Sequence, residues 1–290
     1  MKRRLAVAAI LAGAVAAAVM GWPRPRAIPA PDLAVEGAAT IITARDGARL
    51  FVRGSAQPGP LRALLLHGGN ADSREMLPLR AALSAAGIEA WAPDLRGHRH
   101  SGRHEGTLDR PGQLDDDLSD LMVWLAATHG AKATGLVGFS AGGGLALRTA
   151  TGPHSASFTR FVLLAPNLGA DPTLWAQSPT GWLRVDGTVA SAADAIDRLG
   201  LLPLRWQGQT WRLISNQRPI DKWPVALGKL DRRATVILGT DDRVFNTEAM
   251  ADAFRRHAPA AAIRVLTDLG HQGLVSEPRA LEAIIAALRD

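Results

Sequence analysis

The chain has 290 residues, of which 47% are hydrophobic and 21% charged, so it can bury one core of the size usual for a single domain. Its formal net charge is +6, but the basic residues are scattered rather than clustered, which argues against a nucleic-acid-binding surface. The absence of cysteine excludes disulfides, a thiolate nucleophile and cysteine-ligated metals.

Residues 1–22 have the features of a targeting segment. Lys2, Arg3 and Arg4 precede an uncharged, alanine-rich apolar stretch that runs to Pro23. The alanines at 16–18 offer a signal-peptidase site, whereas the uncut stretch has the roughly 20 residues needed to span a bilayer. Basic residues on the cytoplasmic flank place the remaining chain outside the cytoplasm. We therefore expect export, to the periplasm or the extracellular side, with the segment either removed or retained as a membrane anchor; a buried N-terminal helix is the alternative.

Four prolines then predict a stiff, extended linker over residues 23–37, followed by one folded domain over 38–290. In this domain, short apolar runs predict strands at 40–44, 50–54, 63–66, 89–93, 135–138, 161–165, 235–239 and 263–266. Amphipathic stretches predict helices at 74–86, 115–128, 141–151, 247–257 and 278–288. Such alternation predicts a mostly parallel sheet covered by helices on both faces.

The interval 167–230 is longer than a usual crossover and predicts a cap or lid insertion. It contains five of the eight tryptophans of the chain: Trp175, Trp182, Trp206, Trp211 and Trp223. An extra helical layer in which these rings fill a small core of their own is the alternative.

The stretch LVGFSAGGG contains the pattern G-x-S-x-G, formed by Gly138, Ser140 and Gly142. The serine follows a predicted strand and opens a predicted helix, where a sharp turn presents its hydroxyl above the edge of the sheet. Glycines two residues before and after leave room for the two chain segments to approach closely. A serine in this position is either a nucleophile or only a helix cap, and a nucleophile needs a base and an acid.

Both partners follow later strands. Asp241 and Asp242 come directly after the run at 235–239, and His271 comes after the run at 263–266. The order Ser, Asp, His along the chain is that of α/β-hydrolases and differs from that of other serine-hydrolase folds. Helix capping by the aspartates and a structural role for the histidine are the alternative interpretations.

These motifs resemble the α/β-hydrolase superfamily, in particular its monoglyceride lipase, lysophospholipase and serine aminopeptidase-like branch. The resemblance covers residues 40–288 and implies the α/β-hydrolase fold, a nucleophile Ser140, a base His271 and Asp242, rather than Asp241, as the acid. His67, Gly68 and Gly69 resemble the H-G-x loop of the family, which implies that the N–H groups of Gly69 and Ala141 form the oxyanion hole, while His67 braces the loop.

A second loop, DLRGHRHSG over residues 94–102, resembles the D-x-R-G-H-G-x-S-x-G loop of the same family. Arg99 stands where the family usually has glycine, and this departure puts the local turn in question. His98, His100 and His104 lie close together in the sequence, but no carboxylate or cysteine completes a metal site. We expect neither a metal nor a cofactor.

The expected function is that of a serine hydrolase that cleaves carboxylic esters through an acyl-enzyme. The tryptophan-rich insertion favours an apolar acyl group, so small-molecule or lipid esters, including lysophospholipids, are the expected substrates. An amidase or aminopeptidase is the main alternative, because the insertion also carries acids that could bind a free amine: Asp171, Asp186, Asp194, Asp197 and Asp221. A catalytically silent binding protein with the same fold is the other alternative.

Overall fold

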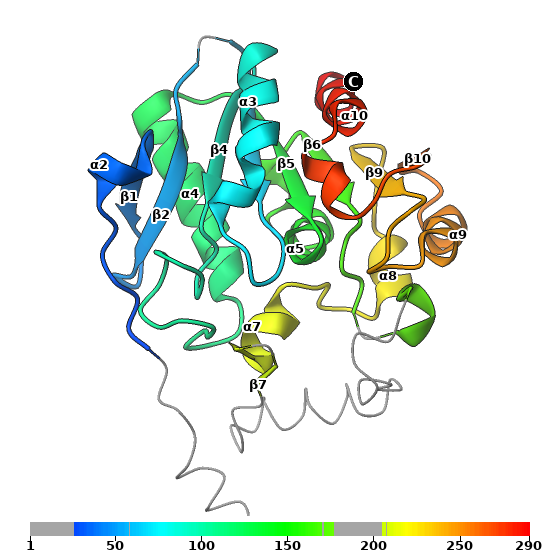
Figure 1. Cartoon of the computed structure of the whole chain (residues 1–290), viewed down its shortest axis with the longest axis horizontal. Coiled ribbons are helices and arrows are strands. Elements are labelled where there is room, and N and C mark those ends of the chain that lie inside the picture. The colour runs from blue at the N-terminus through cyan, green and yellow to red at the C-terminus, as the bar shows by residue number, and fades with distance from the viewer. Residues whose placement is uncertain (1–25, 58, 170, 177–204, 207) are drawn as a thin grey trace, which may run out of the picture.

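The computed structural model describes residues 26–57, 59–169, 171–176, 205–206 and 208–290. Helices and strands alternate along most of this part, as the sequence predicts (Figure 1). None of the helices in the described ranges is long and apolar enough to span a membrane. The expected signal peptide or anchor at 1–22 lies outside the described residues.

Eight strands form the central sheet in the order β1-β2-β4-β3-β5-β6-β9-β10. Within this sheet only β2 runs antiparallel to its neighbours β1 and β4. The remaining pairs are parallel, so their carboxyl ends share one edge. The bounds are β1 Ala39–Thr43, β2 Arg49–Ser55, β3 Leu61–Leu66, β4 Glu89–Pro93, β5 Ala133–Phe139, β6 Arg160–Leu164, β9 Ala234–Gly239 and β10 Ala262–Leu266.

Helices connect the parallel strands and cover both faces of the sheet. A Cβ atom on Gly135 would collide with Leu288 of α10, and one on Gly138 would lie 2.8 Å from Cβ of Ala146 in α5. Because side chains three positions apart on a strand point to opposite faces, α10 and α5 lie on opposite sides of β5. The main helices are α3 Leu77–Ala85, α4 Gln113–His129, α5 Ala141–Ala150, α9 Thr247–His257 and α10 Pro278–Arg289.

The central strands are apolar on both faces, as strands covered twice must be. Leu64, Leu65, Val137, Val162 and Val236 are all fully buried. The predicted α/β class, a mostly parallel sheet flanked by helices, is therefore confirmed. Each predicted strand and helix occurs within a few residues of its expected bounds.

Short elements fill the described parts of the interval 167–230. They are the 3₁₀ turn η3 Pro172–Leu174, the strands β7 Arg205–Trp206 and β8 Gln209–Thr210, and the helices α7 Trp211–Asn216 and α8 Trp223–Leu227. All of them lie between β6 and β9 in the chain, next to the carboxyl edge of the sheet (Figure 1). Residues 177–204, the middle of the expected cap, lie outside the described residues.

Part of the segment 23–37, expected to be an extended linker, is folded. Asp32 caps the short helix α2 Leu33–Glu36, and Ile28 is only 5% exposed. The carboxylate of Glu36 forms an ion pair of 2.6 Å with the buried guanidinium of Arg53 on β2. The pattern of prolines could not reveal this short helix or its ion pair with Arg53.

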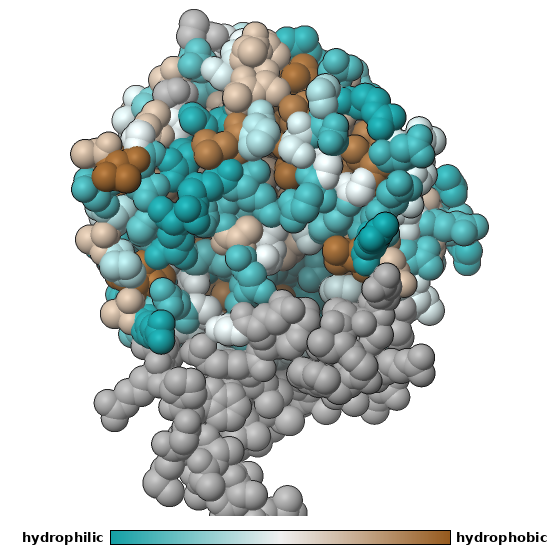
Figure 2. All heavy atoms as spheres, in the orientation of Figure 1, coloured by the Kyte–Doolittle hydropathy of each residue, from teal (hydrophilic) through white to brown (hydrophobic). Residues whose placement is uncertain are grey.

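The surface between these elements is mostly polar. Hydrophilic residues predominate on the described part of the face shown in Figure 2, with apolar residues in small groups among them. Among the described residues, the most exposed large apolar side chains are Val35, Val123 and Ile220, and they belong to separate regions: α2, α4 and the segment after α7.

Candidate active site

Ser140 forms the sharp turn between β5 and α5. Its φ of 54° and ψ of −112° define a conformation that costs a non-glycine residue roughly 1–3 kcal/mol. Hydrogen bonds hold it there: its N–H donates to the carbonyl of Leu164 at 2.9 Å, and its carbonyl accepts from the N–H groups of Asn167 at 2.8 Å and Gly144 at 3.0 Å. Backbone strain of this kind is concentrated at functional positions.

The two motif glycines are required by close contacts. A Cβ atom on Gly138 would collide with the carbonyl oxygen of Gly142. One on Gly142 would collide with the carbonyl oxygens of Leu66 and His67 at the end of β3. The second glycine therefore brings the N-terminus of α5 against the loop after β3, where the oxyanion hole is expected.

Asp242 and His271 lie together at the same edge of the sheet. The distance between Nδ1 of His271 and Oδ2 of Asp242 is 2.6 Å. The other carboxylate oxygen of Asp242 accepts hydrogen bonds from the N–H groups of Val244 at 2.7 Å and Phe245 at 2.9 Å. The side chain of Asp242 is 1% exposed, whereas Asp241 lies at the surface. Of the two aspartates, Asp242 is the one that orients the imidazole.

Aromatic rings contact the His271 imidazole from β5 and from the Asp242 loop, which is the segment 240–246 between β9 and α9. Its ring centroid lies 4.7 Å from that of Phe139 and 5.5 Å from that of Phe245. Because Phe139 directly precedes Ser140, the first contact places the imidazole beside the serine turn. The structure thus pairs His271 with Asp242 and places the imidazole against the residue that precedes Ser140.

The loop after β3, where the oxyanion hole is expected, lies against the N-terminus of α5. A Cβ atom on Gly69 would lie 3.5 Å from Cβ of Ala141, so the two predicted donors belong to adjacent segments. His67 is fully buried, its Nε2 accepts the N–H of Leu95 at 2.9 Å, and its Nδ1–H therefore donates to the carbonyl of Gly68 at 2.8 Å. Burial lowers the pKa of His67 to about 4, so the imidazole is neutral and braces the loop.

The histidines of the second loop have structural contacts. His98 packs edge-on against His67 at 4.9 Å between ring centroids, and its Nε2 accepts from Nε2 of Gln209 at 2.8 Å. Burial lowers the pKa of His98 to about 3. His100 lies 3.2 Å from Oε1 of Glu36. In the described ranges, no group of three or more His, Cys, Asp or Glu side chains could hold a metal ion.

Arg99 occupies a left-handed backbone position, with a φ of 39°. Glycine adopts such a conformation without strain, which explains why the related loops have glycine there. In this chain the guanidinium of Arg99 forms an ion pair with Glu36 of α2. The departure from the family pattern therefore changes one side-chain contact and leaves the turn intact.

Two parts of the site carry no sequence motif. Glu75 accepts a hydrogen bond from the N–H of Gly68, and Trp175 packs against Phe245 at 4.8 Å between ring centroids. Glu75 is seven residues from its partner and Trp175 is seventy, so the fold alone brings them together. The only sequence signal was the concentration of tryptophans in the insertion.

The other insertion tryptophans lie in different surroundings. Trp211 stacks on the guanidinium of Arg218 at 5.2 Å. Trp223 packs against the core and donates from Nε1 to Asp171 at 3.1 Å. Trp182 lies outside the described residues, and so does the side chain of Trp206. The expected acyl pocket therefore stays a prediction.

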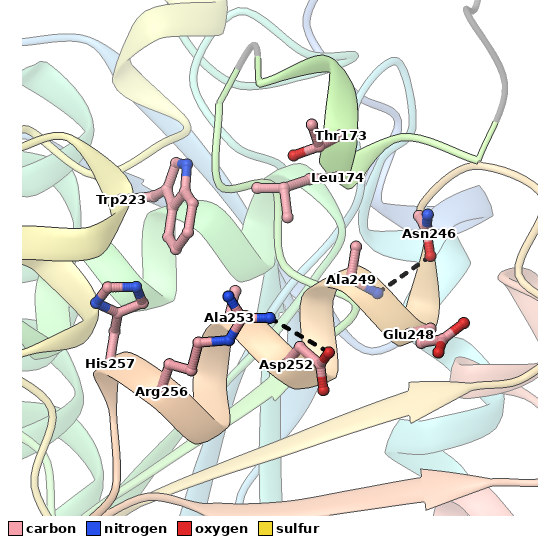
Figure 3. Close-up of a pocket in the computed structure, with 10 residues that line it drawn as sticks. All are labelled: Thr173, Leu174, Trp223, Asn246, Glu248, Ala249, Asp252, Ala253, Arg256 and His257. Carbon is pink, nitrogen blue, oxygen red and sulfur yellow. Dashed lines mark hydrogen bonds and ion pairs between the residues drawn. The ribbon is translucent and has the colours of Figure 1, made fainter.

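A groove of about 430 Å³ lies next to the Asp242 loop, between α8, η3 and α9 (Figure 3). The ring of Trp223 and the side chain of Leu174 cover one wall, and α9 forms the other. None of the residues that line it is Ser140, Asp242 or His271. The groove is therefore separate from the candidate active site. At one end of the groove the rings of Trp223 and His257 are in contact, with 5.3 Å between their centroids.

Comparison with protein families assigns the fold. The model of the alpha/beta hydrolase family matches residues 63–287, which include every candidate site residue. The chain belongs to this family. No curated relative matches the sequence.

Solved structures with the same fold differ in their chemistry. An esterase from Rhodococcus sp. ECU1013 has 19% identity and a TM-score of 0.64, and the match covers 88% of this chain and 99% of that one. A bromoperoxidase from Bacillus anthracis has 17% identity and a TM-score of 0.61, with 87% and 100% covered. A membrane phospholipase A, described as a bacterial virulence factor, has 18% identity and a TM-score of 0.62, with 100% and 98% covered. At this identity these similarities support the fold, and the reaction must be argued from the site.

Proposed function

We propose that this alpha/beta hydrolase is a serine esterase that cleaves carboxylic esters through an acyl-enzyme. The observation that carries the proposal is the strained Ser140 turn beside the imidazole of His271, whose Nδ1 lies 2.6 Å from the buried carboxylate of Asp242. A bond from Nδ1–H to the carboxylate leaves Nε2 as the basic nitrogen, which is the form that can accept the serine proton.

The proposed reaction has two halves. Oγ of Ser140 attacks the ester carbonyl while Nε2 of His271 takes the hydroxyl proton, and Asp242 stabilises the imidazolium. The N–H groups of Gly69 and Ala141 hold the oxyanion, and such donors are each worth roughly 3–4 kcal/mol in the transition state. The imidazolium then protonates the leaving alcohol. Water, activated by the same imidazole, releases the acid and restores Ser140.

An apolar acyl group is the proposed substrate feature, consistent with the monoglyceride lipase and lysophospholipase branch. Two observations support it: the insertion is rich in tryptophan, and one of these rings, Trp175, contacts Phe245 directly beside His271. Esterases and a phospholipase A among proteins of the same fold are compatible with this substrate class.

A free amine is less well accommodated by the described acids of the insertion. Asp171 already accepts hydrogen bonds from Thr173 and Trp223, and Asp221 forms an ion pair of 2.6 Å with Lys229. The remaining acids of that set, Asp186, Asp194 and Asp197, lie outside the described residues. We therefore rank the aminopeptidase alternative below the esterase.

Hydrolysis of p-nitrophenyl esters with acyl chains of about two to sixteen carbons tests the proposal. The full chain in mild detergent should turn over the esters and react with a fluorophosphonate, and Ser140→Ala should abolish both, because removing the nucleophile leaves residual catalysis about 10⁶-fold lower. Preferential turnover of an aminoacyl anilide panel would instead identify an amidase. A folded wild-type protein that ignores esters, anilides and the fluorophosphonate would be a binding protein.

We also propose that the esterase acts outside the cytoplasm, after export directed by residues 1–22. The basic start and the apolar stretch that follows support this proposal. Expression in a bacterium followed by fractionation tests it: the full chain should reach the periplasm or the membrane, and a chain lacking residues 1–22 should stay in the cytoplasm. Equal distributions of the two forms would contradict the proposal.

A further inference from the structure

Both polar backbone groups of Gly68 are held by side chains. Its N–H donates to Oε2 of Glu75 at 2.7 Å, and its carbonyl accepts from Nδ1 of His67 at 2.8 Å. The two contacts fix the peptide planes on either side of Gly68. The donor to the carbonyl, His67, is a neutral imidazole. The acceptor of the N–H, Glu75, is a carboxylate that the proposed mechanism does not use.

The second of these planes carries the predicted oxyanion donor. In a trans peptide the carbonyl and the following N–H point in opposite directions, so holding the Gly68 carbonyl also sets the direction of the Gly69 N–H. Gly69 is next to Ala141, whose N–H is the other predicted donor. A loop of two glycines has wide conformational freedom, and these contacts restrict it before the substrate binds.

Glu75 also contacts the loop that carries His271. A Cβ atom on Gly68 would be 3.1 Å from Oε2 of Glu75 and 3.3 Å from the Phe139 ring, which itself packs on His271. The second carboxylate oxygen, Oε1, is 3.4 Å from Nε2 of Gln272, the residue after His271. Glu75 thus connects the loop after β3 with the loop after β10.

The environment of this carboxylate is unusual for a purely structural contact. Burial raises the pKa of Glu75, whereas the Gly68 N–H, Gln272 and the charge of His271 lower it, and Asp72 raises it further. A neutral acceptor would hold the Gly68 N–H at less cost. A carboxylate has the additional effect of favouring a positive charge on His271, which forms during the reaction.

We propose that Glu75 is a positioning residue that aligns the oxyanion loop and places a negative charge near the loop that carries His271. This inference rests on the proposed esterase function. Its effect is exerted through Gly69 and His271, and Glu75 itself need not touch the substrate.

Two variants separate the two effects. Glu75→Ala removes the acceptor and the charge, whereas Glu75→Gln keeps an acceptor for the Gly68 N–H and removes only the charge. Loss of an oxyanion donor lowers kcat about 10²–10³-fold, so a misaligned donor in Glu75→Ala should lower kcat about 10- to 100-fold with KM within about threefold. An alkylboronic acid, whose adduct with Ser140 resembles the tetrahedral intermediate, should bind more weakly by a similar factor.

Glu75→Gln should recover most of this loss, within about fivefold of the wild-type kcat. Its pH profile should change nevertheless: without the nearby negative charge the acidic limb of kcat/KM should move to lower pH, because the imidazolium is less favoured. Glu248→Gln on α9, which removes an exposed carboxylate, is the matched control and should leave kcat, KM and the profile unchanged. Circular dichroism and the melting temperature check that each variant is folded.

The outcomes are distinct. Wild-type kcat and boronic acid affinity in folded Glu75→Ala, or a fall in melting temperature without a fall in kcat, would overturn this inference while leaving the esterase proposal intact. An unchanged pH profile in Glu75→Gln would overturn the part that concerns His271. A wild-type protein that neither hydrolyses esters nor reacts with a fluorophosphonate would overturn the proposed function, and the role of Glu75 with it.

Discussion

The two neighbouring carboxylates at positions 241 and 242 illustrate how burial assigns roles to chemically identical side chains. Asp242 is buried and accepts hydrogen bonds on both oxygens: from the N–H groups of Val244 and Phe245 on one, and from His271 on the other. Asp241 is exposed and contacts only Thr240 through its side chain among the described hydrogen bonds. Only the first is held in one orientation relative to the imidazole.

Asp242→Asn should lower kcat about 10³- to 10⁴-fold while the protein stays folded, because an amide facing Nδ1 favours the wrong tautomer of the base. Asp241→Asn should change kcat less than about twofold. Ester hydrolysis at pH 8 and the fluorophosphonate labelling rate measure both. Equal losses in the two variants would show that the assignment of the acid is wrong.

At the scale of elements, the beginning of the cap insertion is joined to the Asp242 loop. The N–H of Ala176 donates to the carbonyl of Val244 at 3.1 Å, and the N–H of Asn246 donates to the carbonyl of Leu174 at 2.9 Å. Between these bonds the ring of Trp175 packs on Phe245, which packs on His271. The beginning of the insertion therefore contacts the aromatic ring that packs on the imidazole of His271.

Trp175→Ala should lower kcat/KM for a short butyrate ester about tenfold, because Phe245 loses its support and the imidazole becomes less well oriented. A short acyl chain is chosen so that the result reflects orientation rather than acyl binding. Trp175→Phe, which keeps an aromatic contact, should recover most of the activity. Trp211→Ala is the matched control, since that ring stacks on Arg218 instead of the acid loop; a loss as large as that of Trp175→Ala would contradict the argument.

The positions of the strands and helices could be predicted from the sequence, whereas several contacts between them could not. Hydrophobic periodicity located the strands and helices, and the residues that follow β5, β9 and β10 could be placed at one edge because parallel strands end together. The contacts of Glu75 and Trp175 could not be predicted, because nothing in local pattern indicates which loop a side chain meets after folding. Helix α2 could not be predicted for the same reason, because the ion pair that it forms, Glu36 with Arg53, joins residues of two different segments.

At the scale of the whole molecule, two buried histidines link stability to pH. His67 and His98 are held neutral by burial, which lowers their pKa values to about 4 and about 3. In the unfolded chain their pKa returns to about 6.5. Between these values the unfolded state binds more protons than the folded state, so stability falls as pH decreases from about 6.5 towards 4.

At pH 6 each histidine is about three-quarters protonated in the unfolded chain and almost unprotonated when folded, so unfolding takes up about 1.5 protons at the two imidazoles. Burial also raises the pKa values of Glu75 and Asp94, and it raises that of Asp117 to about 6, so these carboxyl groups release protons on unfolding. At pH 6 Asp117 releases about half a proton, which leaves an expected net uptake of about one proton. Calorimetry in two buffers of different ionisation enthalpy gives the number of protons. The melting temperature should also fall between pH 7.5 and 5.5, and a value that is constant over this range, with no proton uptake, would mean that the two imidazoles are not buried in their neutral form.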